Sequence, residues 1–100
     1  MSEVKTQPVM AALVDSIVDD SAPAGAIKFY ETAEHKPAGF HFQCPCGCRS
    51  VGGVKVAGPG AWTWNGSRDK PTVRASVLLH NPDMSPHWHG WLTDGVWESC

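Results

Sequence analysis

The sequence predicts a mainly β fold, a small domain built on an antiparallel sheet. Three observations favour this class. Only 18% of the 100 residues are charged, 10 glycines and 8 prolines supply turn formers, and five tryptophans supply large rings. Turn formers and large rings suit short strands. From residue 26 onward apolar and polar residues alternate, which is the period of a half-buried strand. A chain of this length suits one domain.

The first 25 residues differ from the rest and are expected to form a short helix or a flexible tail. Their apolar residues recur at three- and four-residue spacing, which is typical of an amphipathic helix. These residues are Met10, Leu13, Val14, Ile17 and Val18. Small residues and a proline at 21–25 predict a flexible joint. We therefore divide the chain into an N-terminal helix or tail, residues 1–25, and a metal-binding β domain, residues 26–100, whose metal motif is described below.

Alternation predicts five strands in the first part of the β domain. They are expected at residues 27–30, 40–44, 54–56, 62–64 and 73–77. The fourth strand runs into Asn65-Gly66, a strong turn pair.

The last segment, residues 87–100, is expected to form a β-hairpin around the turn pair Asp94-Gly95. Counting outward from this turn places His89 opposite Cys100. Directly opposite residues have Cβ atoms about 4.5–5.5 Å apart and point to the same face. We therefore expect an imidazole and a thiol side by side, spaced as two metal ligands.

Three cysteines within five residues form the strongest local motif. Residues 44–48 read CPCGC, which is similar to a compressed zinc knuckle. In such a turn the glycine lets the backbone bend around the sulfurs. Four cysteines in a chain with reduced thiols more often bind metal than form disulfides. Buried, reduced cysteines are the alternative, and the C-x-x-C spacing of a redox pair is absent.

A closed structural zinc site takes four ligands in a tetrahedron. The expected ligands are Cys44, Cys46, His89 and Cys100. Cys48 is the substitute, and one hairpin ligand drops out if all three knuckle thiols bind. His87 shares the strand parity of His89 and is an alternative in an outer or open position. Carboxylate-poor surroundings exclude calcium and magnesium, so zinc is the expected cofactor.

Composition and motifs also exclude several classes of protein. The formal net charge is −2, whereas a non-specific nucleic-acid binder needs an excess of Lys and Arg. No apolar run of 18 residues predicts a membrane span, and no signal peptide is expected. We expect a cytoplasmic protein, in which cysteines stay reduced. No Ser-His-Asp order, phosphate-binding loop or H-E-x-x-H motif is present.

Several separated motifs resemble a small family that occurs in phages and prophages. The motifs are FHFQCPCGC at residues 40–48, WTWNG at 62–66, PT at 71–72 and HWHGWLTDG at 87–95. The resemblance covers residues 26–100 and implies a bacterial host cell but no assigned activity. This chain has Ala75 where the family has a second proline, and Trp88 where it has a cysteine. Some members are labelled ammonia monooxygenase, a membrane-bound copper enzyme that a soluble chain of this size cannot be.

These observations favour a non-catalytic zinc-binding module that binds a protein partner, as a phage or prophage accessory protein. Thiolate-rich zinc sites are typically closed and structural, and a bound ion helps a short chain to fold. One alternative is a metal-dependent, hydrolase-like enzyme with an open zinc position, in which His87, Glu98 or Asp94 acts as acid or base. Another is a nucleic-acid accessory factor, supported only by the basic middle of the chain and the tryptophans.

Overall fold

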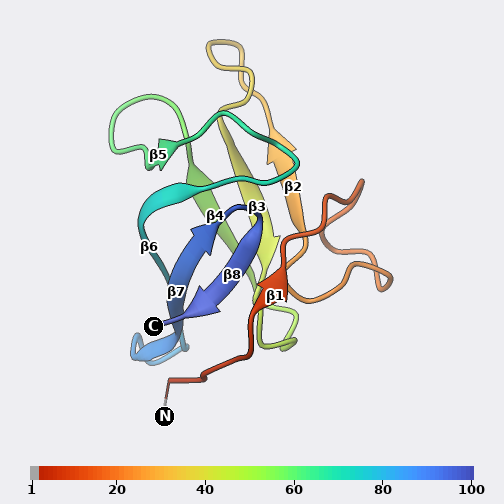
Figure 1. Ribbon diagram of the computed structural model, residues 1–100, viewed down its shortest axis with the longest axis vertical. Helices are drawn as coiled ribbons and strands as arrows, with labels where there is room; N and C mark the ends of the chain where they lie inside the picture. Colours follow the sequence, from red (N-terminus) through yellow and green to blue (C-terminus); the bar gives the residue numbers. More distant parts are fainter. Residues whose placement is uncertain (1–2) are drawn as a thin grey trace.

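The structure is a computed structural model that describes residues 3–100 and consists of two antiparallel sheets. The larger sheet has five strands in the order β1-β8-β7-β6-β5, and the smaller has three in the order β2-β3-β4 (Figure 1). The strands are β1 (Val9–Met10), β2 (Ile27–Tyr30), β3 (Gly39–Gln43), β4 (Val51–Lys55), β5 (Thr63–Trp64), β6 (Val73–His80), β7 (Pro86–Thr93) and β8 (Val96–Ser99). Among the described residues we find no helix that could cross a membrane. The mainly β, antiparallel class predicted from the sequence is confirmed.

Aromatic side chains from both sheets fill the space between them. On β3, Phe40 and Phe42 are buried and flank the exposed His41. The Phe42 ring lies 4.7 Å from the ring of Trp97 on β8, which meets Trp88 of β7 edge-on at 5.7 Å. Each of these rings removes a large apolar area from water. The core therefore ties β3 to the hairpin of β7 and β8.

The described part of the N-terminal segment, residues 3–25, contains no helix. Instead, β1 pairs with β8, and Ala11 is buried in the core. Met10 and Val18 are 76% and 74% exposed, so the apolar residues of this segment do not face the core as one stripe. Pairing with the distant β8 thus overrides the helix-like spacing that the sequence shows. The helix alternative is not found in the described residues.

The terminal hairpin has the register that its turn pair predicts. Gly90 pairs with Ser99, and the pairing continues inward to Thr93 and Val96. Asp94 and Gly95 both have positive φ, 48° and 75°, as expected for a two-residue turn that matches the strand twist. Outward, the Cys100 amide donates to the His89 carbonyl at 2.9 Å. The predicted backbone juxtaposition of residues 89 and 100 is confirmed.

Candidate functional site

Two clusters of side chains lie next to β7, one at His87 and the other at His89. The side chains of His87 and His89 alternate along this strand with the buried Trp88 and Gly90. Because successive side chains of a strand point to opposite faces, the two histidines lie on the same side, away from the core. Each contacts a different set of residues.

The first set is the metal cluster, which we define as Cys44, Cys46, Cys48 and His87. Its three cysteines lie in the turn that follows β3, where the Gly47 amide donates to the Cys44 carbonyl at 3.1 Å, and His87 lies on β7. Gly47 has a φ of 87°, which explains why glycine follows the second cysteine. The ligand atoms of all four residues lie within 4.8 Å of one another.

The donor set of the metal cluster suits a tetrahedral metal ion. The Sγ atoms of Cys44 and Cys46 are 3.2 Å apart. His87 Nε2 lies 3.3 Å from Cys46 Sγ and 3.4 Å from Cys48 Sγ. All three cysteines are free thiols. With a metal–sulfur bond of about 2.3 Å, tetrahedral ligands stand roughly 3.5–4 Å apart, so small shifts would seat an ion here.

The thiols of Cys44 and Cys48 differ in the direction in which their surroundings shift the pKa. Burial raises the pKa of Cys44, and the neighbouring thiols of Cys46 and Cys48 raise it further. Burial also acts to raise the pKa of Cys48, but hydrogen bonds from the side chain and backbone of Ser50, from Cys46 and from His87 outweigh it and lower this pKa to about 6. Cys48 is therefore a thiolate at neutral pH and attracts a cation, whereas Cys44 needs the metal to displace its proton.

The cluster shares two residues with the ligand set expected from the sequence. Cys44 and Cys46 are brought together, but His89 and Cys100 lie outside the group, and Cys48 and His87 take part instead. The predicted pairing within the hairpin is observed. The turn that carries the cysteines, however, lies beside His87 of β7 rather than beside His89. Two residues along a strand span about 6.6 Å, so His89 lies one pleat beyond the thiols. Cys100 is exposed at the end of β8.

The second set is the serine–histidine pair, Ser76 on β6 and His89 on β7. Ser76 Oγ lies 2.8 Å from His89 Nε2. The backbone pairs Leu78 with His89, so Ser76 is the diagonal neighbour on the same face, within reach of a long side chain. The other ring nitrogen, His89 Nδ1, faces a carboxylate oxygen of Glu3 at 3.9 Å.

Ser76 is open to solvent on one side. A shallow hollow of about 230 Å³ lies beside it, lined by Gly60, Ala61, Trp62, Arg74, Ala75 and Ser76. The Trp62 indole donates to the Ser76 carbonyl at 3.2 Å. This bond holds Trp62, which lines the hollow, against β6. A second hollow of about 330 Å³ shares Arg74 and reaches Trp91 and Glu98. Ser76 thus lines a hollow that borders β6.

A serine hydroxyl at hydrogen-bond distance from an imidazole nitrogen is the minimal unit of an activated nucleophile. Sequence reasoning missed this pair because Ser76 lacks a recognised local motif and the order of the residues differs from the usual ones. A signal was nevertheless present. Ser76 falls on the polar positions of the alternating segment at 73–77, and His89 shares that face if the two strands pair.

Comparison with known families identifies the chain. A family model described as "Bacterial ubiquitination-like system serine protease (BubE)" matches residues 14–100. The comparisons with curated proteins and with solved structures gave no match. The matched range contains the metal cluster and both members of the serine–histidine pair, whereas Glu3 precedes it. The match covers most of the chain, and the chain therefore belongs to the bacterial ubiquitination-like system serine protease (BubE) family.

Proposed function

We propose that the protein is a serine hydrolase that cleaves peptide bonds, with Ser76 as the nucleophile and His89 as the general base. The observation that carries this proposal is the 2.8 Å contact between Ser76 Oγ and His89 Nε2. The description of the family as a serine protease supports it. A protein partner, which the sequence led us to expect, would then be the protein substrate.

The reaction follows from the positions of these two groups. Ser76 Oγ attacks the carbonyl carbon of the scissile bond while His89 Nε2 takes the hydroxyl proton. The same nitrogen then gives this proton to the leaving amine, so that the peptide bond breaks and an ester forms on Ser76. Water, deprotonated by His89, hydrolyses the ester and restores the enzyme. The two hollows that Arg74 lines are where the substrate chain would lie.

The metal cluster serves this enzyme as a structural zinc site in our proposal. Three thiols and one imidazole would hold the ion with four protein ligands, the number that closed structural sites use. This argues against the metal-dependent hydrolase considered from the sequence. When bound, zinc would supply folding energy, because the cysteines of the turn after β3 and His87 of β7 would hold it together, and it would take no part in bond cleavage. The bacterial cytoplasm, where thiols stay reduced, suits such a site.

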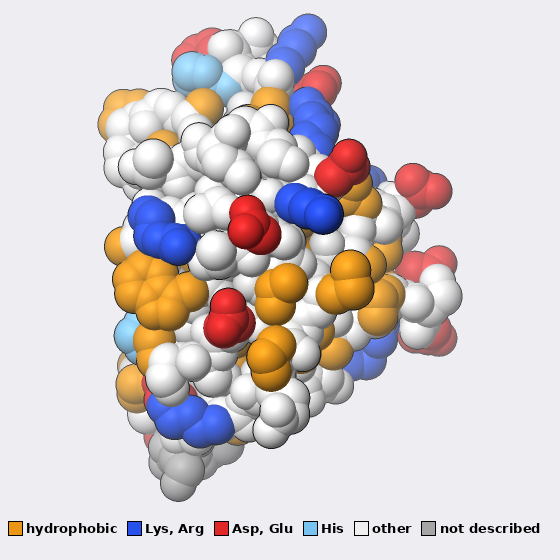
Figure 2. Space-filling model, viewed as in Figure 1, with side chains coloured by type: hydrophobic (Ala, Val, Ile, Leu, Met, Phe, Trp, Pro, Cys, Tyr) orange, Lys and Arg blue, Asp and Glu red, His pale blue; other side chains and the backbone are white. Residues whose placement is uncertain are grey.

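Nucleic-acid binding has less support. On the face drawn in Figure 2, the Lys and Arg side chains are interspersed with Asp and Glu side chains. This face therefore offers no continuous basic stripe of the kind that follows a phosphate backbone.

A fluorophosphonate probe tests the proposed function without knowledge of the substrate, because it phosphonylates an activated serine Oγ and releases fluoride. We expect one adduct on Ser76, absent from Ser76→Ala and His89→Ala. Ser21→Ala is the matched control, since that hydroxyl donates to the Asp19 carboxylate rather than to a histidine. Equal labelling of Ser76→Ala, or no labelled serine in the parent, would refute the proposal. Elemental analysis should find one zinc per chain, which Cys46→Ser loses.

A further inference from the structure

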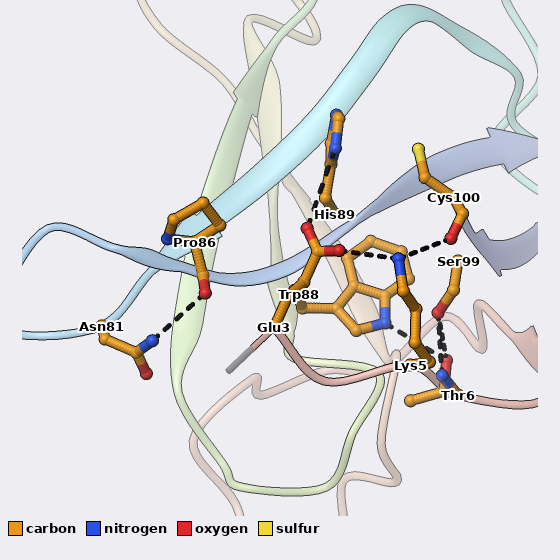
Figure 3. A network of polar contacts seen from close by, with 9 residues as sticks. All are labelled: Glu3, Lys5, Thr6, Asn81, Pro86, Trp88, His89, Ser99 and Cys100. Atoms are coloured by element: carbon orange, nitrogen blue, oxygen red, sulfur yellow. Dashed lines mark hydrogen bonds and ion pairs between the residues drawn. The ribbon is translucent and has the colours of Figure 1, made fainter. Parts of the chain in front are cut away.

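The N-terminal strap, which we define as residues 3–6, contacts both β7 and β8, and Figure 3 shows its Glu3 beside His89. The Val4 amide donates to the His87 carbonyl at 2.6 Å. Two residues on, the Thr6 amide donates to Ser99 Oγ at 2.8 Å, and Thr6 Oγ1 accepts from the Trp88 indole at 3.1 Å. Val4 and Thr6 thus attach the strap to both strands of the hairpin.

These anchors place the side chains of Glu3 and Lys5 next to the histidine. Figure 3 shows the Glu3 carboxylate between the His89 ring and the Lys5 ammonium. One carboxylate oxygen lies 3.9 Å from His89 Nδ1, and the other accepts from Lys5 Nζ at 2.7 Å. Lys5 Nζ also donates to the Cys100 carbonyl at 2.8 Å. Lys5 therefore ties the carboxylate to the end of the hairpin and leaves its second oxygen facing the imidazole.

We propose that Glu3 is a positioning residue, whose carboxylate holds the His89 ring in the orientation and tautomer that Ser76 requires. This inference rests on the proposed function. A carboxylate accepts from Nδ1–H, which leaves the lone pair of Nε2 free to take the serine proton. The distance of 3.9 Å is that of an ion pair rather than a hydrogen bond, and such contacts in ligand-free structures are often longer than in the reacting complex.

One further observation supports this role. The hydrogen bond from Lys5 is the main cause that lowers the pKa of Glu3, so this carboxyl is an acceptor at neutral pH. Glu3 precedes the range matched by the family model, residues 14–100. The third group of the site is thus supplied by a segment of this chain that the family match does not contain.

The test compares variants at Glu3 in the full chain. Glu3→Gln keeps the size of the side chain but removes its charge, and it should slow fluorophosphonate labelling of Ser76 by at least about tenfold, as loss of the orienting acid does in serine proteases. Glu3→Asp should recover part of the rate. Glu34→Gln, in the exposed connection between β2 and β3, makes the same charge change elsewhere and should label as the parent does.

A second measurement tests the contact between Glu3 and His89 without relying on the reactivity of Ser76. The NMR shifts of the histidine ring nitrogens, with the His89 signals assigned by their loss in His89→Gln, should change from a protonated Nδ1 in the parent to a mixed tautomer in Glu3→Gln. Equal labelling rates and an unchanged tautomer in Glu3→Gln would overturn the role of Glu3 and leave Ser76 as the nucleophile. If the parent fails to label, the proposed function falls, and with it the positioning role, even where the tautomer responds.

Discussion

Replacing the two histidines of β7 one at a time should separate metal binding from reactivity. His87 Nε2 faces the thiols of the metal cluster, whereas His89 Nε2 faces Ser76. His87→Ala removes one of four ligands. Structural zinc contributes about 12 kcal/mol in zinc-finger peptides, so an equal share is about 3 kcal/mol per ligand, or roughly a 100-fold rise in the zinc Kd. His89→Ala should leave this Kd unchanged and abolish labelling of Ser76.

The zinc Kd is measured by competition with a chromophoric chelator, and labelling by mass spectrometry of the intact chain. Cys48→Ser and Cys100→Ser form a second matched pair of exposed cysteines, of which only the first should weaken zinc binding. A rise of the Kd in His89→Ala and Cys100→Ser, with none in His87→Ala and Cys48→Ser, would refute the reasoning. It would restore the ligand set expected from the sequence, Cys44, Cys46, His89 and Cys100.

Two further predictions concern the thiols and the packing of β7. In the zinc-free protein, the rate at which iodoacetamide alkylates Cys48 should rise through pH 6 and then level off, because the lowered pKa of about 6 leaves a thiolate above that pH. The alkylation rate of a free cysteine peptide, with a pKa of about 8.5, should instead keep rising above neutral pH. Added zinc should protect Cys48, and Cys48→Ser should lose this phase. Gly90→Ala should lower the free energy of unfolding in urea by about 1–3 kcal/mol, because its Cβ would collide with the Glu98 backbone and the Trp88 ring. Gly53→Ala is the control, since the nearest atom to its Cβ would lie at 3.6 Å.

Local patterns account for the parts of the fold that the sequence predicts. Alternation around Phe40 and Phe42 marks β3, and the turn pair Asp94-Gly95 sets the register of β7 and β8. Each of these features depends on residues close together in the chain. The N-terminal segment was less predictable, because its helix-like spacing competes with pairing between Val9 and Trp97, which are far apart in sequence.

The same contrast, between patterns local in the sequence and contacts between distant residues, explains which parts of the site could be predicted. The spacing of Cys44 and Cys46 is local, and their thiols do lie together in a group that could hold a metal ion. Parity alone cannot choose between His87 and His89, since both side chains point to one face of β7. The choice depends on where the cysteine turn meets that strand, a contact between residues 41 positions apart for Cys46 and His87. The serine–histidine pair likewise requires the pairing of β6 with β7.

His87 is the residue at which the two clusters are joined. Its side chain faces the thiols of Cys46 and Cys48, and its carbonyl accepts from the Val4 amide, which anchors the strap that carries Glu3. An ion bound at the metal cluster would therefore fix the position of β7 one pleat before His89, on the strand that also holds the strap. Because the His87 carbonyl belongs to the backbone, His87→Ala removes the zinc ligand but leaves the anchor of the strap in place. Loss of zinc should thus loosen the serine–histidine pair without dismantling it, in contrast to the complete loss that follows from removing His89.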